Sequence, residues 1–171
     1  VVLGNMNSSQ RSDEPRIIEF ALKKLGITPI PVQILDRHRR NGYLEGGDFI
    51  SADDISFIGR GLRTDKRAVH ELLKNNVFGT EYVAVVKDGW ENQQEMHLDT
   101  YFNIIGPKLA VLSEWRLSGE KKGVEKDKAT RLDLYQLTGD KYDLIAEDLN
   151  FYEYLVERGF KVIPVSESDQ L

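Results

Sequence analysis

The stretch DFISADDISFIGRGLRTDKRAVHELLKNNVFGTEYVAVV, residues 48–86, predicts the repeating unit of the fold. Its elements follow in the order strand 48–52, strand 55–59, helix 64–75 and strand 82–86. The two strands meet at Asp53-Asp54, a dipeptide typical of a turn. The helix has apolar residues at helical spacing, namely Ala68, Val69, Leu72 and Leu73. Strands that alternate with a helix in this way indicate an α/β fold.

The same order recurs further along the chain. Two strands, 101–105 and 109–112, turn at Gly106-Pro107. A helix from about Asp148 to Gly159, with Tyr152, Leu155 and Val156 on its buried face, precedes a strand at 161–165. A stretch from Leu117 to about Lys141, rich in Lys, Glu, Asp and Gly, interrupts this second unit. We predict a surface loop or a hairpin there.

The first residues supply only the last parts of such a unit. These are Val1–Leu3, a helix that starts at Asp13-Glu14-Pro15 and ends at Gly26, and a strand within 29–35. We therefore interpret 1–171 as one domain with a partial unit 1–35, a unit 44–87 and a unit 97–166 that includes the insertion 117–141. Repeats around an axis bring equivalent positions to one central opening, whereas an ordinary mixed sheet with helices on its faces need not. The pattern fits both arrangements.

Composition excludes several classes of function. The 171 residues are 40% hydrophobic and 30% charged with a net charge of -5, which fits a globular domain and disfavours a nucleic-acid partner. Apolar runs are strand-sized, so we expect no membrane partner and a cytoplasmic location. No cysteine is present, which excludes disulfides, thiolate zinc sites and a thiol nucleophile in this chain. Val1 lies inside an apolar run and Leu171 follows closely after a strand, so we expect a piece of a longer protein.

Two short motifs combine residues that can do chemistry. In Glu45-Gly46-Gly47-Asp48, two glycines between two carboxylates allow positive φ or a close approach of a ligand, although Gly-Gly is also common turn punctuation. In His97-Leu98-Asp99, strand spacing would place the imidazole and the carboxylate on one face. Glu45 and His97 occupy equivalent places, each just before the first strand of its unit. A histidine that only caps a strand is the structural alternative.

Two arginines are further candidates for substrate binding, and a metal site is the remaining alternative. Arg63 lies in a glycine-flexed turn before a helix and Arg11 lies before another helix, so either could hold a carboxylate through its bidentate fork. A His-x-Asp pair supplies two ligands of a facial triad for iron, but no histidine follows His97. We therefore predict no metal site. Nucleophile-elbow and phosphate-loop motifs are absent from the sequence.

Taken together, these motifs resemble those of the arginine deiminases, within the wider guanidine-modifying group that includes amidinotransferases and dimethylarginine hydrolases. The resemblance rests on Gly46-Gly47 between two acids, on an arginine 18 residues after Glu45, and on Met-His-Leu-Asp-Thr beginning 51 residues after Glu45. It extends from about Val1 to Val165 without the insertion 117–141. Tyr101 stands where valine is usual, and Arg11 falls on the family's arginine that precedes a glutamate.

The resemblance implies an incomplete α/β-propeller of the pentein type and a set of roles. His97 would act as general acid and base, and Glu45 would hold its imidazole. Asp99 would bind the guanidinium in its plane, while Asp48 is either a further ligand or an anchor of its loop. Arg11 and Arg63 would hold the α-carboxylate of L-arginine, the implied small-molecule partner. The implied reaction gives L-citrulline and ammonia through an amidino-cysteine intermediate, without a cofactor.

The sequence departs from the family in one important respect. Neither the attacking cysteine nor the glycine-rich segment that surrounds it is present, and a second guanidinium-binding aspartate would precede Val1. We therefore expect the chain alone to be inactive as a deiminase. The alternatives are amidino transfer through the same intermediate, and a non-catalytic domain that binds arginine or a partner. An open ring would expose strand edges, so we also expect self-association into a homo-oligomer or a poorly ordered margin.

Overall fold

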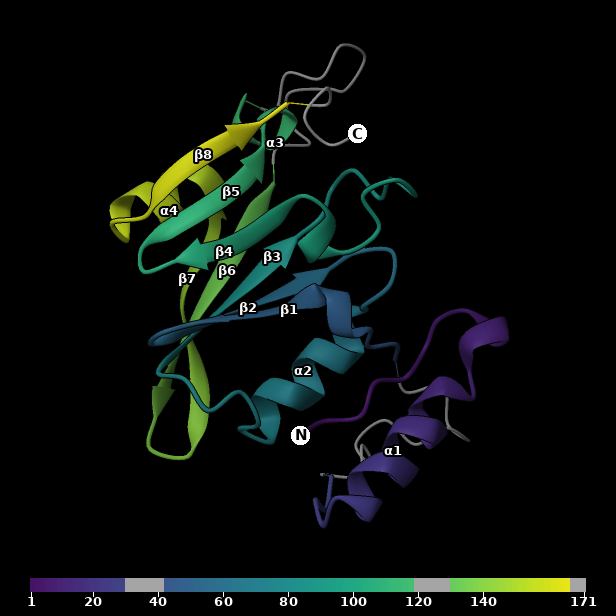
Figure 1. Cartoon of the computed structure of the whole chain (residues 1–171). Coiled ribbons are helices and arrows are strands. Elements are labelled where there is room, and N and C mark those ends of the chain that lie inside the picture. Colours follow the sequence, from purple (N-terminus) through teal and green to yellow (C-terminus); the bar gives the residue numbers. More distant parts are fainter. Residues whose placement is uncertain (30–41, 119–129, 167–171) are drawn as a thin grey trace.

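Two β-sheets with helices on their flanks make up the molecule (Figure 1). The computed structural model describes residues 1–29, 42–118 and 130–166. One sheet has the strand order β1-β2-β3-β6-β7 and the other has the order β4-β5-β8. The predicted strand within 29–35 falls almost entirely outside the described residues. Within the described ranges, no helix is long and apolar enough to cross a membrane.

The two complete units have the same topology. In the first, β1 (Phe49–Ala52) pairs antiparallel with β2 (Ile55–Arg60), which pairs parallel with β3 (Tyr82–Lys87) after the helix α2 (Lys66–Lys74). In the second, β4 (Phe102–Gly106) pairs antiparallel with β5 (Leu109–Ser113), which pairs parallel with β8 (Lys161–Val165) after α4 (Phe151–Glu157). The strand-strand-helix-strand repeat predicted from the sequence is therefore present in both units.

The interrupted part of the second unit differs from a simple surface loop. After the short helix α3 (Glu114–Ser118), strand β6 (Arg131–Thr138) pairs antiparallel with β3 of the first unit. Strand β7 (Lys141–Asn150) then pairs with β6. The hairpin therefore covers 131–150 rather than the predicted 117–141, and it extends the sheet of the first unit. Leu132 is fully buried in that sheet. Residues 119–129 lie outside the described residues.

Helix α4 begins later than predicted. Asp148 belongs to β7, and the side chain of Asn150 caps the helix by accepting a hydrogen bond from the Glu153 N–H at 3.1 Å. The shift of the start changes which residues face the core. Phe151, Tyr154 and Leu155 are buried, whereas Val156, expected to be buried, is 50% exposed.

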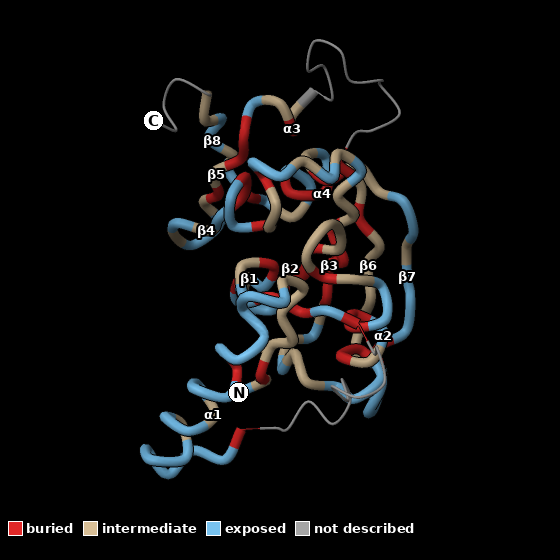
Figure 2. Tube along the Cα trace, turned by 90° about the vertical axis from the view of Figure 1, so that its right-hand side faces the viewer, coloured by how far each residue is buried: buried red, intermediate tan, exposed pale blue. Residues whose placement is uncertain are grey.

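The main core joins the two sheets through a group of aromatic rings. Phe57 on β2 is fully buried, and its ring centroid lies 5.1 Å from that of Phe102, 6.2 Å from that of Phe151 and 6.3 Å from that of Phe160. A second core forms under α2, where Ala68, Val69, Leu72 and Leu73 pack toward the sheet as predicted. Figure 2 shows the buried residues concentrated between the sheets and under α2.

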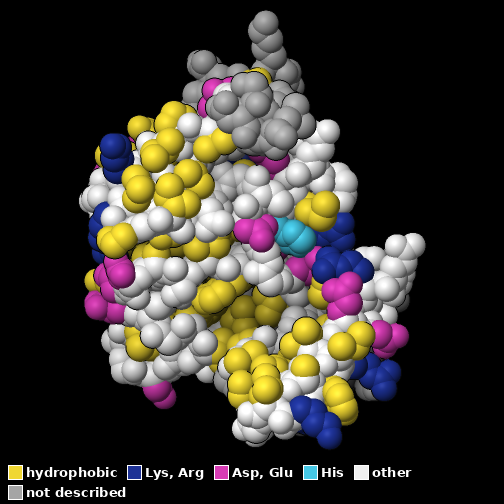
Figure 3. Space-filling model, viewed as in Figure 1, with side chains coloured by type: hydrophobic (Ala, Val, Ile, Leu, Met, Phe, Trp, Pro, Cys, Tyr) yellow, Lys and Arg dark blue, Asp and Glu magenta, His cyan; other side chains and the backbone are white. Residues whose placement is uncertain are grey.

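The N-terminal part lies apart from these cores. After the turn η1 (Ser9–Arg11), helix α1 (Glu14–Lys24) begins and ends close to the predicted residues, and Pro15 is its only buried residue. Its apolar residues Ile17 and Phe20 are 67% and 64% exposed, as Figure 2 shows for the helix as a whole. A nearby hollow of about 360 Å³ is lined mainly by apolar side chains, which are visible in Figure 3.

Candidate active site

Glu45 and His97 come together because they hold equivalent positions in their two units. Glu45 precedes the turn η3 (Gly46–Asp48) that leads into β1, and His97 precedes the turn η4 (Leu98–Thr100) before β4. His97 Nε2 lies 2.9 Å from Glu45 Oε2, within hydrogen-bond distance. The glutamate is 1% exposed and the histidine 15%. Repetition of the unit therefore pairs two residues 52 positions apart.

Glu45 is held by a set of donors from several segments. The backbone N–H of Asn7 donates to Oε1 at 3.0 Å, and Arg11 Nη1 donates to Oε2 at 3.0 Å. Arg63 Nη1 lies 3.8 Å from Oε1. The backbone of Glu45 is also fixed, because its N–H donates to the Thr64 hydroxyl at 3.2 Å. These contacts orient the carboxylate toward the imidazole and compensate its burial.

Of the two glycines, Gly47 is the one that other side chains of the site approach closely. A Cβ at Gly47 would lie 2.9 Å from both carboxylate oxygens of Asp99 and 2.9 Å from His97 Cγ, whereas a Cβ at Gly46 would meet nothing within 4 Å. Neither glycine has the positive φ that the sequence allowed, and the groups that approach are side chains of the other motif. Gly47 therefore lets His97 and Asp99 approach the same point.

The two glycines form a matched pair for mutation. We expect Gly47→Ala to lower the free energy of unfolding by about 1–3 kcal/mol, because His97 and Asp99 must move away from the added methyl group. Gly46→Ala should be neutral or stabilising by about 0.4–1 kcal/mol, since it restricts only the unfolded chain. Urea denaturation of both variants measures the difference. Equal effects of the two substitutions would contradict the close approach at Gly47.

The Asp48 carboxylate binds the backbone of the His97 segment and does not face a ligand cavity. Its Oδ1 accepts the N–H of Leu98 at 2.9 Å, which fixes the start of η4 beside His97. Its Oδ2 is buried without a hydrogen-bond partner among the described residues. Burial raises the pKa of the Asp48 carboxyl from its ordinary 3.8 to about 6. The geometry favours the anchoring alternative for this residue over direct contact with a ligand.

The raised pKa makes a prediction about pH. Between about pH 4 and pH 6 the folded protein keeps a proton on Asp48 that the unfolded chain releases, so this carboxyl lowers stability as pH rises through that window. The loss is up to about 3 kcal/mol. Asp48→Asn retains the acceptor for Leu98 and should therefore gain stability relative to the wild type from pH 4 to pH 7. Urea denaturation across this range measures it, with Asp143→Asn on β7 as the exposed control. Parallel curves for Asp48→Asn and wild type would contradict the prediction.

The remaining candidates lie around the Glu45–His97 pair. Arg11 directs Nε and Nη2 to the Glu14 carboxylate at 2.8 and 2.9 Å, so its fork is already occupied. Arg63 is 17% exposed, and its Nε has no hydrogen-bond partner among the described residues. Asp99 is exposed in the turn η4, which replaces the strand spacing expected for His97-Leu98-Asp99. Figure 3 shows a histidine with acidic and basic side chains gathered around it on this side of the molecule.

A buried charge cluster next to these residues was not predicted from the sequence. Arg116 on α3 pairs with Asp88 at 2.6 Å and with Glu95 at 3.0 Å. All three side chains are less than 10% exposed. The sequence does place two acidic residues, Asp88 and Glu95, at the ends of the polar segment before His97. It does not indicate that an arginine 21 residues after Glu95 pairs with both. Within the described ranges, no three His, Asp or Glu side chains are grouped closely enough to hold a metal ion.

Comparisons with known proteins agree with this arrangement. A family model described as arginine deiminase matches residues 1–169. The arginine deiminase of Halobacterium salinarum is 32% identical, in an alignment that covers 71% of this chain and 31% of that protein. The chain thus spans about a third of the length of this curated relative.

Solved structures with the same fold include two with arginine-related ligands. DDAH from Pseudomonas aeruginosa, a mutant complexed with citrulline, matches with a TM-score of 0.51 and 17% identity over 96% of this chain and 63% of that one. A dimethylarginine dimethylaminohydrolase adduct with S-methyl-L-thiocitrulline matches with a TM-score of 0.50 and 16% identity over 97% and 64% of the two chains. The expected fold, an incomplete α/β-propeller of the pentein type, is confirmed.

Proposed function

The chain belongs to the arginine deiminase family, and from that membership and the site geometry we propose that it is part of an enzyme that hydrolyses L-arginine to L-citrulline and ammonia. One observation carries the proposal beyond the family match. His97 meets the buried carboxylate of Glu45 at 2.9 Å, while Asp99 and His97 approach the same glycine. An acid–base group, His97, and a carboxylate that can bind a guanidinium, Asp99, therefore lie next to each other.

The residues of this chain divide the chemistry among them. Asp99, exposed and without a hydrogen bond or ion pair within the described ranges, is available to bind the guanidinium cation. His97 transfers protons, first to the departing ammonia and then from the attacking water. Glu45 fixes the imidazole and stabilises its protonated form. The thiol that attacks the guanidinium carbon lies outside this chain, so the isolated chain is inactive in this proposal.

Arg63 and Arg11 differ in how readily they can bind the α-carboxylate of the substrate. Arg63 has a buried Nε without a partner among the described residues and faces the Glu45 side of the site. Arg11 must release Glu14 before its fork can bind another carboxylate. We therefore assign the first contact to Arg63, and Arg11 follows by exchanging Glu14 for the substrate.

A chimeric enzyme tests the function. In the arginine deiminase of Halobacterium salinarum, the matching segment is replaced by this chain, and citrulline and ammonia are measured with L-arginine as substrate. We expect citrulline and equimolar ammonia. A new guanidino compound formed when an amine is added would identify amidino transfer instead. A folded chimera that forms neither product, beside an active halobacterial parent, would contradict the proposal.

A further inference from the structure

The segment that leads to His97 is held at both of its ends by one buried side chain. Arg116 Nη1 donates to Asp88 Oδ1 at 2.6 Å, directly after β3, and Nη2 donates to Glu95 Oε2 at 3.0 Å, two residues before His97. Nη1 also donates to the Thr130 hydroxyl at 3.1 Å. A single guanidinium on α3 therefore closes residues 88–95 into a loop.

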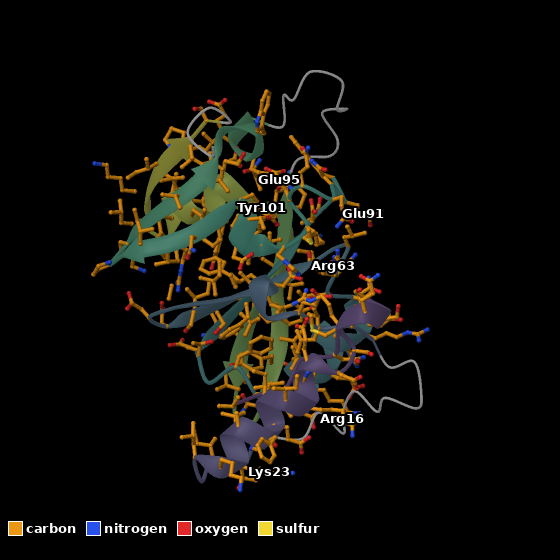
Figure 4. The ribbon with its side chains drawn as sticks, turned by 45° about the vertical axis from the view of Figure 1, so that its right-hand side comes forward. Arg16, Lys23, Arg63, Glu91, Glu95 and Tyr101 are labelled. Atoms are coloured by element: carbon orange, nitrogen blue, oxygen red, sulfur yellow. The ribbon has the colours of Figure 1, made fainter. Side chains whose placement is uncertain are left out.

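Two aromatic rings pack against this guanidinium. Its carbon lies 3.9 Å from the ring centroid of Tyr101 and 4.7 Å from that of Trp90. Tyr101 follows η4 directly and is buried. Trp90 lies in the loop 88–95, where its backbone N–H donates to Asp88 Oδ1 at 3.0 Å. Figure 4 shows Glu95 and Tyr101 close together above Arg63. The cluster thus contacts the chain immediately before and immediately after the His97 turn.

The cluster also lies behind the histidine itself. Asp88 and Tyr101 line the same recess as His97, Met96 and Leu98, and this recess has no room for a water molecule. A shift of the loop or of Tyr101 must therefore move the protein surface against which His97 rests. From these contacts we propose that Arg116 is a positioning residue that sets the orientation of His97 toward Glu45. This role rests on the proposed function of His97 and adds a residue to it.

The burial of the cluster explains why one residue can have this effect. Arg116 is fully buried, and its two carboxylate partners are 7% and 9% exposed. A buried carboxylate that loses its cation must move toward water, accept a proton or find another donor. Loss of Arg116 leaves two such groups, one at each end of the loop. The Glu95 end is only two residues from the imidazole, so the displacement reaches His97.

Nuclear magnetic resonance of the purified 171-residue chain tests the role without requiring turnover. Ring nitrogen and carbon signals of the three histidines are recorded, and those of His97 are assigned with His97→Asn. Glu45→Gln serves as the reference for a His97 that has lost its carboxylate partner. We expect the His97 ring signals of Arg116→Met to move from the wild-type position most of the way to the Glu45→Gln position. His70 signals should stay unchanged.

Arg158→Met is the matched control. Arg158 also pairs with a carboxylate, Asp54 at 2.8 Å, and its guanidinium carbon lies 4.6 Å from the Tyr82 ring centroid, but Asp54 is at the opposite end of β1 from Glu45. This variant should lose stability yet keep the wild-type His97 signals. If it shifts His97 equally, the role of Arg116 is general stability and the inference is wrong. Unshifted His97 signals in a folded Arg116→Met would overturn it directly.

A conservative variant keeps the test decisive if Arg116→Met does not fold. Lysine retains the charge but cannot hold Asp88 and Glu95 at once through a planar fork. Arg116→Lys should therefore shift the His97 signals part of the way to the Glu45→Gln position. Wild-type signals in this variant would show that simultaneous binding of Asp88 and Glu95 by Arg116 does not orient His97. Because these spectra do not depend on citrulline formation, an inactive chimera with shifted His97 signals would reject only the proposed function.

Discussion

Replacing His97 by asparagine in the chimera should lower the rate of citrulline formation by about 10²–10⁴-fold, the range typical of a lost general acid–base group. Asparagine can still form a hydrogen bond with Glu45 but cannot transfer the two protons that the proposed reaction requires. The loss should fall mainly on kcat rather than KM, since the substrate contacts of Asp99 and Arg63 remain. Steady-state kinetics with L-arginine measure both constants.

His70→Asn is the control for this experiment. His70 is exposed on α2, and none of the contacts that hold Glu45 or His97 involves it. The control should retain the activity of the chimera. A His97→Asn chimera whose kcat stays within a few-fold of its parent would show that His97 does not transfer protons.

The largest expected loss of stability comes from the aromatic core. Phe57→Ala should lower the free energy of unfolding by about 3–5 kcal/mol, because it removes a fully buried ring and leaves a cavity between the sheets. Edge-to-face contacts with Phe102, Phe151 and Phe160 are lost together. Since Phe57 lies on one sheet and Phe102 on the other, the substitution weakens the joint between the two units. Urea denaturation of the chain gives the difference.

Phe49→Ala provides the matched comparison on the same sheet. Phe49 on β1 is 43% exposed, and among the described residues its ring has one aromatic neighbour, Phe78, at a centroid distance of 6.3 Å. Its loss should cost no more than about 1.5 kcal/mol, because less apolar area leaves the core. If both substitutions cost the same, the joint between the sheets does not depend on Phe57.

Local pattern was sufficient for most elements of the two units. The apolar spacing in 64–75 predicted α2 to within two residues, because helical periodicity is encoded in neighbouring residues. The turn at Asp53-Asp54 and the strand 161–165 were predicted for the same reason. Strands β6 and β7 were harder to predict, because their polar faces resemble a surface loop. Their place in the sheet depends on the pairing of β6 with β3, whose partner residues lie 44–54 positions earlier in the chain.

The repeat, and with it the equivalent positions of Glu45 and His97, could be predicted from local periodicity. The assembly of the site depends on tertiary packing. In the folded chain Asp48 accepts the backbone N–H of Leu98, Gly47 leaves room for Asp99 and His97, and Arg116 binds the loop before His97. The reason is physical: periodicity reports which face of an element is apolar, whereas contacts between buried charges depend on how distant segments pack.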